Sequence, residues 1–338
     1  MRLERDRCKV KSDALEAQMK AWEAAQSNAT EQKEGAIESK GKEKEKEKDG
    51  ASGGSKRSKF GHPKDSVIPG PEVRDNPYSH AHFEPVMAHE FQLRKTFKGH
   101  RQAISAMCLH PKKPILCTVS DDQSWKMWSI PKGDLIMSGE GHKDWISSCQ
   151  FHPKGSLLAT ASGDGTVKLW DFMKAVCSYT FAEHTQAVWD VAFHEGGDFF
   201  VSASMDHTTK LWDLNSQRCR QTFRGHVDSV NSVCFQPFTN TICTASGDKT
   251  VSLWDMRSGL CSQTFYGHQN AVTHASFNPS GDTIISSDAD GVVKLWDVRV
   301  VSEKGHFRTL GTQPVNEARI DRSGLIAALA SEDGTIKM

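Results

Sequence analysis

The stretch SGDGTVKLWD, residues 162–171, decides the fold, because near-copies of it return along the chain at a fixed interval. Taken alone, its two aspartates, two glycines and serine fit a cation loop, a phosphate cradle, or a hairpin that leads into a buried strand. The interval selects among these. Trp recurs every 42 residues, at Trp128, Trp170, Trp212, Trp254 and Trp296. A regular period of this length is typical of a repeat architecture.

Three other residue types keep the same register. A His precedes each Trp by 28 residues, a Ser or Thr by 10, and an Asp by 6. The sets are His100, His142, His184, His226 and His268; Thr118, Thr160, Ser202, Thr244 and Ser286; and Asp122, Asp164, Asp206, Asp248 and Asp290. Five copies without an insertion indicate five equivalent structural units.

Within one repeat the apolar periodicity is two, which is the period of a strand. The runs 145–151, 156–162, 166–171 and 175–181 are rich in β-branched or aromatic residues, and turn residues separate them. Four short strands in about 42 residues describe one blade of a β-propeller. A helical solenoid would need amphipathic runs of ten or more residues, and the repeat has none.

The paired motifs carry a family resemblance. GH stands at 99–100, 141–142, 225–226 and 267–268, and WD at 170–171, 212–213, 254–255 and 296–297. From about residue 91 to 338 the chain therefore resembles the WD-repeat family, with Glu183 and Ser129 as departures from the two motifs.

The resemblance implies a hydrogen-bonded relay within each blade. In the second repeat, His142 would link Asp164 to Thr160, and Thr160 would accept the indole N–H of Trp170. The alternative, a hydrolase triad of hydroxyl, His and Asp, is disfavoured because a triad occurs once in a protein and this set occurs five times. We therefore expect a structural role for all twenty residues.

The expected fold is an all-β propeller with five full blades and an incomplete sixth. The last repeat keeps Asp333 but has Leu329 where Ser or Thr is expected. The segment FQLRKTF, residues 91–97, matches fourth-strand segments and is expected to supply the outer strand of the sixth blade. We expect a shortened form of a seven-bladed ring, in preference to a ring that closes with six blades.

The first ninety residues differ in kind from the repeats. Residues 1–34 predict a charged helix, which is either simply solvated or the end of a coiled coil. Residues 35–90 combine dense alternating charge with Gly, Ser and Pro, which predicts a disordered low-complexity linker. The propeller domain is expected over 91–338. A basic cluster, Lys56, Arg57 and Lys59, fits either a nuclear import signal or a solvated run.

Composition argues against several classes of function. The 42 Lys and Arg balance the 42 Asp and Glu, so no cationic surplus favours nucleic acid. No window reaches the ~18 apolar residues of a membrane span. The nine Cys are scattered without a CxxC pair and no secretion signal precedes them, which fits an intracellular, reducing compartment.

Candidate sites for chemistry are weak. His80, His82 and His89 lack Cys partners and lie in the linker, so they do not predict a metal site. The DxDG of Asp288–Gly291 continues as an apolar strand instead of an EF-hand loop. No catalytic motif occurs in a suitable context. We expect a non-enzyme without metal, cofactor or small-molecule substrate.

Protein binding remains, and two aromatic residues are the candidates for it. Trp145 and Trp189 follow the His turns, where the resemblance implies a rim near the central channel; the alternative is packing between blades. Their expected neighbours on this rim are Arg101, Lys143, Asp144, Asn231 and Thr273. An extended peptide or a helix of a partner protein is the expected ligand.

The wider resemblance narrows the family. Residues 97–128 and the repeat after them are similar to the sperm-associated antigen sixteen family of axonemal central-pair proteins; residues 97–128 read FKGHRQAISAMCLHPKKPILCTVSDDQSWKMW. This implies an adaptor of motile cilia and sperm flagella, with axonemal or microtubule-associated partners and a place in the cytoplasm and cytoskeleton. The alternatives are an adaptor in the cytoplasm or nucleus of germ cells, or a substrate receptor of a ubiquitin ligase. The last is disfavoured because residues 1–90 hold no F-box-like apolar helical set.

Overall fold

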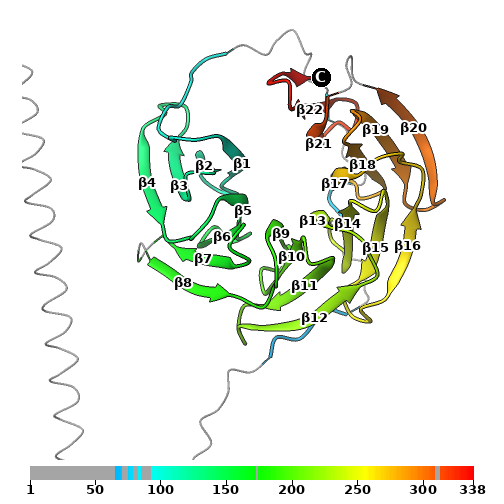
Figure 1. Ribbon diagram of the computed structural model, residues 1–338, viewed down its shortest axis with the longest axis horizontal. Helices are drawn as coiled ribbons and strands as arrows, with labels where there is room; N and C mark the ends of the chain where they lie inside the picture. The colour runs from blue at the N-terminus through cyan, green and yellow to red at the C-terminus, as the bar shows by residue number, and fades with distance from the viewer. Residues whose placement is uncertain are drawn as a thin grey trace, which may run out of the picture. The chain divides into compact units, whose positions relative to one another are not determined.

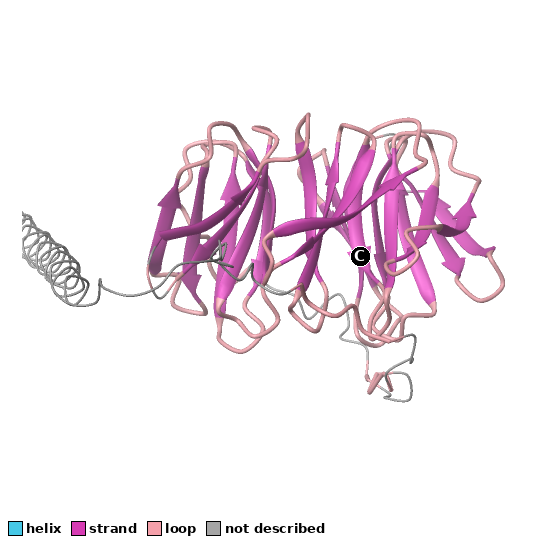
Figure 2. Ribbon diagram, turned by 90° about the horizontal axis from the view of Figure 1, so that it is seen from below, coloured by secondary structure: helices cyan, strands magenta, loops and turns pink. Residues whose placement is uncertain are grey.

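Strands alone make up the regular structure that can be described for this chain. The computed structural model describes residues 65–70, 75–78, 83–84, 93–172, 174, 176–308 and 313–338. These residues form six antiparallel sheets arranged around a common centre (Figure 1). In the side view of Figure 2 the strands run across the thickness of the ring, and the turns gather on its two faces. Within the described part, no helix is long and apolar enough to cross a bilayer.

Each sheet is one blade, and its strands follow the order of the chain from the inside of the ring outward. The inner strands are β1 (Ile104–Leu109), β5 (Ile146–Phe151), β9 (Val188–Phe193), β13 (Val230–Phe235), β17 (Val272–Phe277) and β21 (Val315–Ile320). The second strands are β2 (Ile115–Ser120), β6 (Leu157–Ser162), β10 (Phe199–Ser204), β14 (Thr241–Ser246), β18 (Thr283–Asp288) and β22 (Ala327–Ser331). The third strands are β3 (Ser124–Ser129), β7 (Val167–Asp171), β11 (Thr208–Asp213), β15 (Val251–Asp255), β19 (Val292–Asp297) and β23 (Ile336–Lys337). The outer strands are β4 (Leu135–Glu140), β8 (Val176–Phe181), β12 (Arg218–Arg224), β16 (Cys261–Phe265) and β20 (Ser302–Arg308).

The number of blades corrects the expectation of five and a fragment. Residues 315–337 form a separate sheet, β21-β22-β23, so the ring has six blades, the last with three strands. Residues 93–97 do not pair with it, because the described part of the segment 91–97 is irregular. The match of residues 93–97 to outer strands is therefore a similarity of sequence and not of structure.

The hairpin between the second and third strands explains the opening stretch. Gly165 has a φ of +76°, and its N–H bonds to the carbonyl oxygen of Ser162. A left-handed residue of this kind reverses the chain in a short turn, and Gly adopts it without a steric cost. Val167 and Leu169 then face the core between the second and third blades. The stretch is a hairpin and a buried strand.

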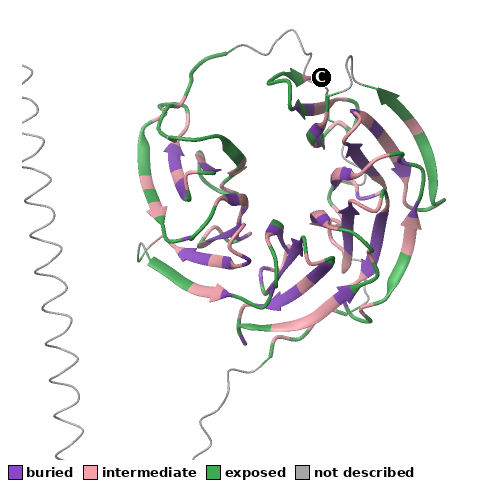
Figure 3. Ribbon diagram, viewed as in Figure 1, coloured by how far each residue is buried: buried purple, intermediate pink, exposed green. Residues whose placement is uncertain are grey.

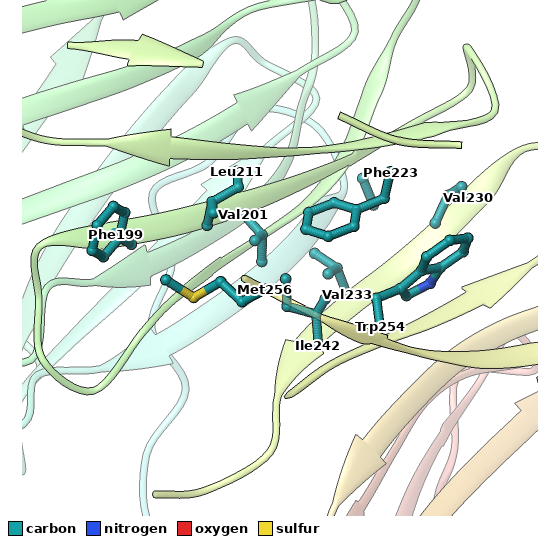
Figure 4. Packing of buried hydrophobic residues seen from close by; sticks show 11 residues of the cluster. Phe199, Val201, Leu211, Phe223, Val230, Val233, Ile242, Trp254 and Met256 are labelled. Carbon is teal, nitrogen blue, oxygen red and sulfur yellow. The ribbon is translucent and has the colours of Figure 1, made fainter. Parts of the chain in front are cut away.

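Apolar contacts hold neighbouring blades together. Figure 4 shows such a cluster between the third and fourth blades, where Phe199, Val201 and Leu211 meet Ile242 and Trp254. These side chains alternate along their strands, so each sheet presents an apolar face to the next. The outer strands β4 and β20 are largely exposed, as Figure 3 shows, and β12 is mostly half-buried; each has a neighbouring strand of its sheet on one side alone.

The inner strands pack in sequence from β1 to β21, and among the described residues β21 and β1 do not pack in the same way. Ile104 of β1 is 54% exposed, although its equivalent in the next blade, Ile146, is fully buried. Met107 and Leu109, on the same face of β1, are also exposed. This face of the first blade therefore lacks the apolar cover that every other inner strand receives.

Part of the expected linker is bound to the propeller. Residues 65–70 and 75–78, which we call the docked segment, lie against the third to fifth blades. Ser66 donates to both carboxylate oxygens of Asp213, from its backbone N–H at 2.7 Å and from its hydroxyl at 2.6 Å. Ile68 packs on the core between the third and fourth blades.

Two amides and an ion pair extend this attachment. Asn240 donates to the carbonyl oxygens of Pro69 and Gly70, Asn76 donates to that of Pro279, and Arg220 pairs with Asp65 at 2.7 Å. The expectation of a disordered linker is therefore wrong for these residues, because polar contacts and the packing of Ile68 hold them on the propeller. The docked segment and the propeller fall within one compact unit. The expected helix at 1–34 and the candidate metal histidines lie outside the described residues.

Candidate functional site

The repeated polar residues form a hydrogen-bonded chain in each of the first four blades. In the second blade, His142 Nδ1 donates to Asp164 at 3.0 Å, and its Nε2 lies 2.8 Å from Thr160 Oγ1. Thr160 Oγ1 also accepts the indole N–H of Trp170 at 2.8 Å. An ionised carboxylate only accepts, so it fixes the proton of His142 on Nδ1 and leaves Nε2 as an acceptor for the Thr160 hydroxyl.

The carboxylates of these chains have all their acceptor positions filled. Asp164 accepts from His142, from the backbone N–H of Lys143 and from both the backbone and hydroxyl of Thr166. Burial acts to raise the pKa of Asp164, but these donors hold it well below its usual range. The same holds for Asp122, Asp206 and Asp248. Because the Thr160 hydroxyl is fully buried and bonded on both sides, the arrangement orders a blade and offers no nucleophile.

The fifth blade departs from the expected pattern. His268 donates to Asp288 at 2.8 Å, and Asp290, the residue in register, bonds to Asn270 instead. The reason lies in Val292, which stands where the other blades have a Ser or Thr that binds the in-register Asp. In the absence of that hydroxyl, the carboxylate that accepts from the His comes from Asp288. Asp288 occupies the repeat position that Ser162 holds in the second blade. Asp290 as a member of the relay is therefore a wrong expectation.

A second set of polar contacts links each blade to the next, and we call these contacts interblade clasps. Ser105 donates to Ile146 O, Ser147 to Val188 O, Asn231 to Val272 O and Thr273 to Val315 O. These donors occupy one repeat position near the start of the inner strand. Between the third and fourth blades that position is Trp189, which has no hydroxyl or amide to donate in this way.

The neighbouring residue replaces the missing clasp. Asp190 accepts from Ser148 of the second blade at 2.7 Å and from Ser232 of the fourth blade at 3.0 Å. It also accepts the backbone N–H of Val233 at 2.9 Å. Burial raises the pKa of Asp190, which these donors partly oppose. One carboxylate thus joins three successive blades, and Trp189 is left free of a structural hydrogen bond across the junction.

Trp189 instead meets Trp145 across the boundary of the second and third blades. Their ring centroids are 4.9 Å apart, and Trp189 is 36% exposed while Trp145 is half-buried. Trp145 lies close over Gly163, where an added Cβ would come within 2.5 Å of its Cε2 atom. The absence of a side chain at Gly163 therefore allows the Trp145 indole to pack against Trp189.

The two indoles line a cavity of about 980 Å³ at the inner ends of the blades. Its wall also contains the clasp residues Asn231 and Thr273, whose polar groups are already bonded, and the carboxylates of Asp121 and Asp144, of which Asp144 accepts the backbone N–H of Trp145. Arg101 does not line it, and Lys143 is exposed outside it. No Lys or Arg appears among the residues that line this cavity in the described ring, so its charge is negative.

The comparisons with known proteins agree with this geometry. The family model for "WD domain, G-beta repeat" matches residues 91–129, 133–171, 175–213, 217–255 and 259–297, more than half of the chain. The chain belongs to the WD-repeat family. This WD-repeat chain is also 52% identical, over 67 residues, to a protein described as "Flagellar WD repeat-containing protein Pf20" from Chlamydomonas reinhardtii. The aligned part is 20% of the chain and 11% of that relative's length.

The sequence placed some parts of this WD-repeat site and missed others. Trp145, Trp189, Asn231 and Thr273 line the same cavity, and Arg101 does not. The contact between the two tryptophans crosses a blade boundary, as the alternative of packing between blades predicted, and a role in binding a partner stays a prediction. Asp190 was missed, although its signal is visible: the equivalent positions are Ser148 and Ser232, and an acidic residue between two hydroxyl donors predicts a shared acceptor. The family itself indicates a protein-interaction fold, in which loop faces rather than the core bind partners.

Proposed function

We propose that this WD-repeat chain is a non-catalytic adaptor of the flagellar or ciliary axoneme, and that it binds a partner protein at the Trp145–Trp189 pair. The main support for this binding site is that Trp189 stands where other blades have the donor of an interblade clasp. At this position Trp189 is large, partly exposed and makes no clasp, so its side chain is available to a partner. Paired tryptophans with an apolar face and a polar edge are good anchors for a protein partner.

The charge of the cavity indicates what the partner presents there. Asp144 lies next to Trp145, Asp121 contributes a second carboxylate, and the described residues that line the wall include no Lys or Arg. A Lys or Arg side chain would find an aromatic face and an acceptor in the same place, worth about 0.5–2 kcal/mol for the ring contact alone. The partner segment is therefore a peptide or helix with a basic residue at its tip.

The axonemal setting is supported by the flagellar relative. The name of that relative refers to the flagellum, so the comparison gives the nuclear alternative no support. Because the alignment spans a small part of that relative, the setting is a proposal for this chain and needs its own test.

The test is co-sedimentation of the purified chain with demembranated axonemes. Three proteins are compared: the unchanged chain, the Trp145→Ala/Trp189→Ala double variant, and Tyr266→Ala, which removes an aromatic side chain that is 75% exposed elsewhere on the ring. We expect the unchanged chain and Tyr266→Ala to sediment equally, and the double variant to bind at least about tenfold more weakly, as for loss of an aromatic anchor.

Two results would overturn separate parts of the proposal. If the unchanged chain stays in the supernatant, the axonemal role is wrong. If the double variant sediments as well as the unchanged chain while remaining folded, the axonemal role stands and the tryptophan pair is not its binding site.

A further inference from the structure

Three cysteine thiols meet where the first blade packs on the second. Cys108 lies on β1, Cys117 is its cross-strand partner on β2, and Cys149 lies on β5. Their sulfur atoms all lie within 4.8 Å of one another, and Cys108 Sγ is 3.3 Å from Cys149 Sγ. Cys117 and Cys149 are buried, and Cys108 is half-buried. The closest pair therefore spans two blades and has one partly accessible member.

The repeat shows that this contact is particular to one junction. At the position of Cys108, the fourth and fifth blades have Cys234 and Ser276, which bond to backbone oxygens of the next blade. At the position of Cys149, the third and fourth blades have the apolar residues Val191 and Val233. Sulfur faces sulfur between the first and second blades because only this junction, among the described blades, has Cys at both positions.

The three thiols are not equivalent chemically. Hydrogen bonds from Cys117 and then Cys149 lower the pKa of Cys108 to about 5, against the opposing effect of burial. Burial raises the pKa of Cys117, and the thiolate at Cys108 helps to raise that of Cys149. These pKa shifts favour the thiolate at Cys108 over that at Cys117 or Cys149, and the thiolate is the form that reacts with oxidants.

We propose that Cys108 is a site of oxidation by peroxides and that Cys149 resolves it into a disulfide between the first and second blades. The Cys108 thiolate attacks one peroxide oxygen, the O–O bond breaks, and the leaving oxygen takes a proton to give water or an alcohol. Cys108 is then a sulfenic acid. The Cys149 sulfur attacks the Cys108 sulfur as its proton is lost, the S–O bond breaks, and water leaves. Two thiols are oxidised by two electrons and one peroxide is reduced.

The disulfide would join strands that the chain separates by 41 residues. The disulfide would tie β1 of the first blade covalently to β5. Among the described residues, strand β1 packs against a neighbouring blade on one side alone. A cross-link that closes a loop of this length stabilises the folded chain mainly by restricting the unfolded one.

The experiment exposes the reduced full chain to a small excess of hydrogen peroxide, blocks the remaining thiols by alkylation and maps the tryptic peptides. Trypsin separates all three cysteines, since Lys112 lies between Cys108 and Cys117. We expect a linked pair of peptides containing Cys108 and Cys149, formed at least about tenfold faster than oxidation of the exposed thiols Cys177 and Cys261, as expected of a thiolate with a lowered pKa. The oxidised chain should also unfold at a higher urea concentration than the reduced chain.

Matched variants use residues that the repeat already accepts. In Cys149→Val, which copies the third and fourth blades, we expect the Cys108 sulfenic acid to accumulate and to be trapped by dimedone, with no gain in stability. The internal control is the cross-strand pair Cys234 and Cys243 of the fourth blade, which has Ala275 in place of a third thiol. It should stay reduced under the same treatment.

Three outcomes would overturn the proposal. Cys108 could react no faster than Cys177 and Cys261. The linked peptides could join Cys108 to Cys117 instead of Cys149. The purified chain could carry a thiolate-bound metal ion at this cluster and form no disulfide until the metal is removed.

Discussion

His268 donates a hydrogen bond to Asp288 at 2.8 Å, and not to Asp290, which the 42-residue register places opposite it. Asp288 and His268 are both buried, so each provides the hydrogen-bond partner that water cannot provide to the other. Burial lowers the pKa of His268, and the Asp288 carboxylate opposes this effect.

This relationship predicts unequal effects of two neighbouring substitutions. Asp288→Ala leaves a buried His without its acceptor and should lower the free energy of unfolding by about 2–3 kcal/mol. Asp290→Ala removes a hydrogen bond with Asn270 between two half-buried side chains and should cost less, about 0.5–1 kcal/mol. Urea denaturation of the two variants measures both values. Equal losses would contradict the assignment of Asp288 to the relay.

The buried carboxylates predict how stability depends on pH. The pKa values of Asp122, Asp164, Asp206 and Asp248 are lowered in the folded chain, so the unfolded chain binds protons first as the pH falls. Their contribution is therefore complete above the unfolded value of about 4 and is lost progressively below it.

Urea midpoints measured from about pH 6 to about pH 2.5, on both sides of the unfolded pKa of about 4, would test the direction of this pH dependence. The midpoint should fall steeply on the acid side, and Asp164→Asn should fall less steeply because it lacks one of the titrating groups. A midpoint that rises as the pH decreases would contradict the prediction.

The exposed face of β1 predicts that one substitution has different costs in two blades. Ile146 is fully buried against the first blade, and Ile104 occupies the same repeat position with 54% exposure. Ile146→Ala should lower the free energy of unfolding by about 2–5 kcal/mol, and Ile104→Ala by less than about 1 kcal/mol. The difference between the two losses of free energy thus measures how much more tightly Ile146 is packed than Ile104. Similar losses would show that Ile104 is covered in solution.

The docked segment predicts a change in hydrogen exchange at Ser66. Asp213→Ala removes both hydrogen bonds to Ser66, so the backbone N–H of Ser66 should exchange with solvent at least about tenfold faster, as expected for the loss of a charge-assisted contact. Asp255→Ala alters the equivalent Asp of the fourth blade and should leave this exchange unchanged. Exchange that is equally fast in the unchanged chain would contradict the docking.

The close approach of Trp145 to Gly163 predicts an optical signature. Gly163→Ala places a methyl group where the indole lies, so it should separate the two rings and reduce their exciton couplet in the circular dichroism spectrum. Gly305→Ala is the control, because nothing lies within 4 Å of its added Cβ. A couplet that persists in Gly163→Ala would mean that the pair is formed in another way.

Much of the fold follows from the sequence because a strict repeat fixes equivalent residues without knowledge of distant contacts. The hairpin at Gly165 and the chain of His142, Thr160 and Trp170 are properties of one repeat, visible within 29 residues. The change to Asp288 was missed because it depends on the loss of a hydroxyl at Val292, which matters only once the two side chains are known to meet.

Other features lie beyond the repeat. Trp145 and Trp189 are not at equivalent positions, so their contact arises from the way two blades lie side by side. The docked segment was missed for a different reason: Ser66 and Asn76 read as ordinary linker residues, and the groups that bind them are more than a hundred residues away in the chain.

The interblade clasps have an evolutionary consequence. Each donor is a side chain, such as Ser147 or Asn231, but each acceptor is a backbone carbonyl, which no substitution can remove. A blade can therefore exchange its donor without a compensating change in the blade that receives it. Serine, threonine and asparagine already serve in this role, and Trp189 shows that a donor can be lost altogether when Asp190 takes over the tie. Single blades of this ring are thus free to acquire new surfaces one mutation at a time.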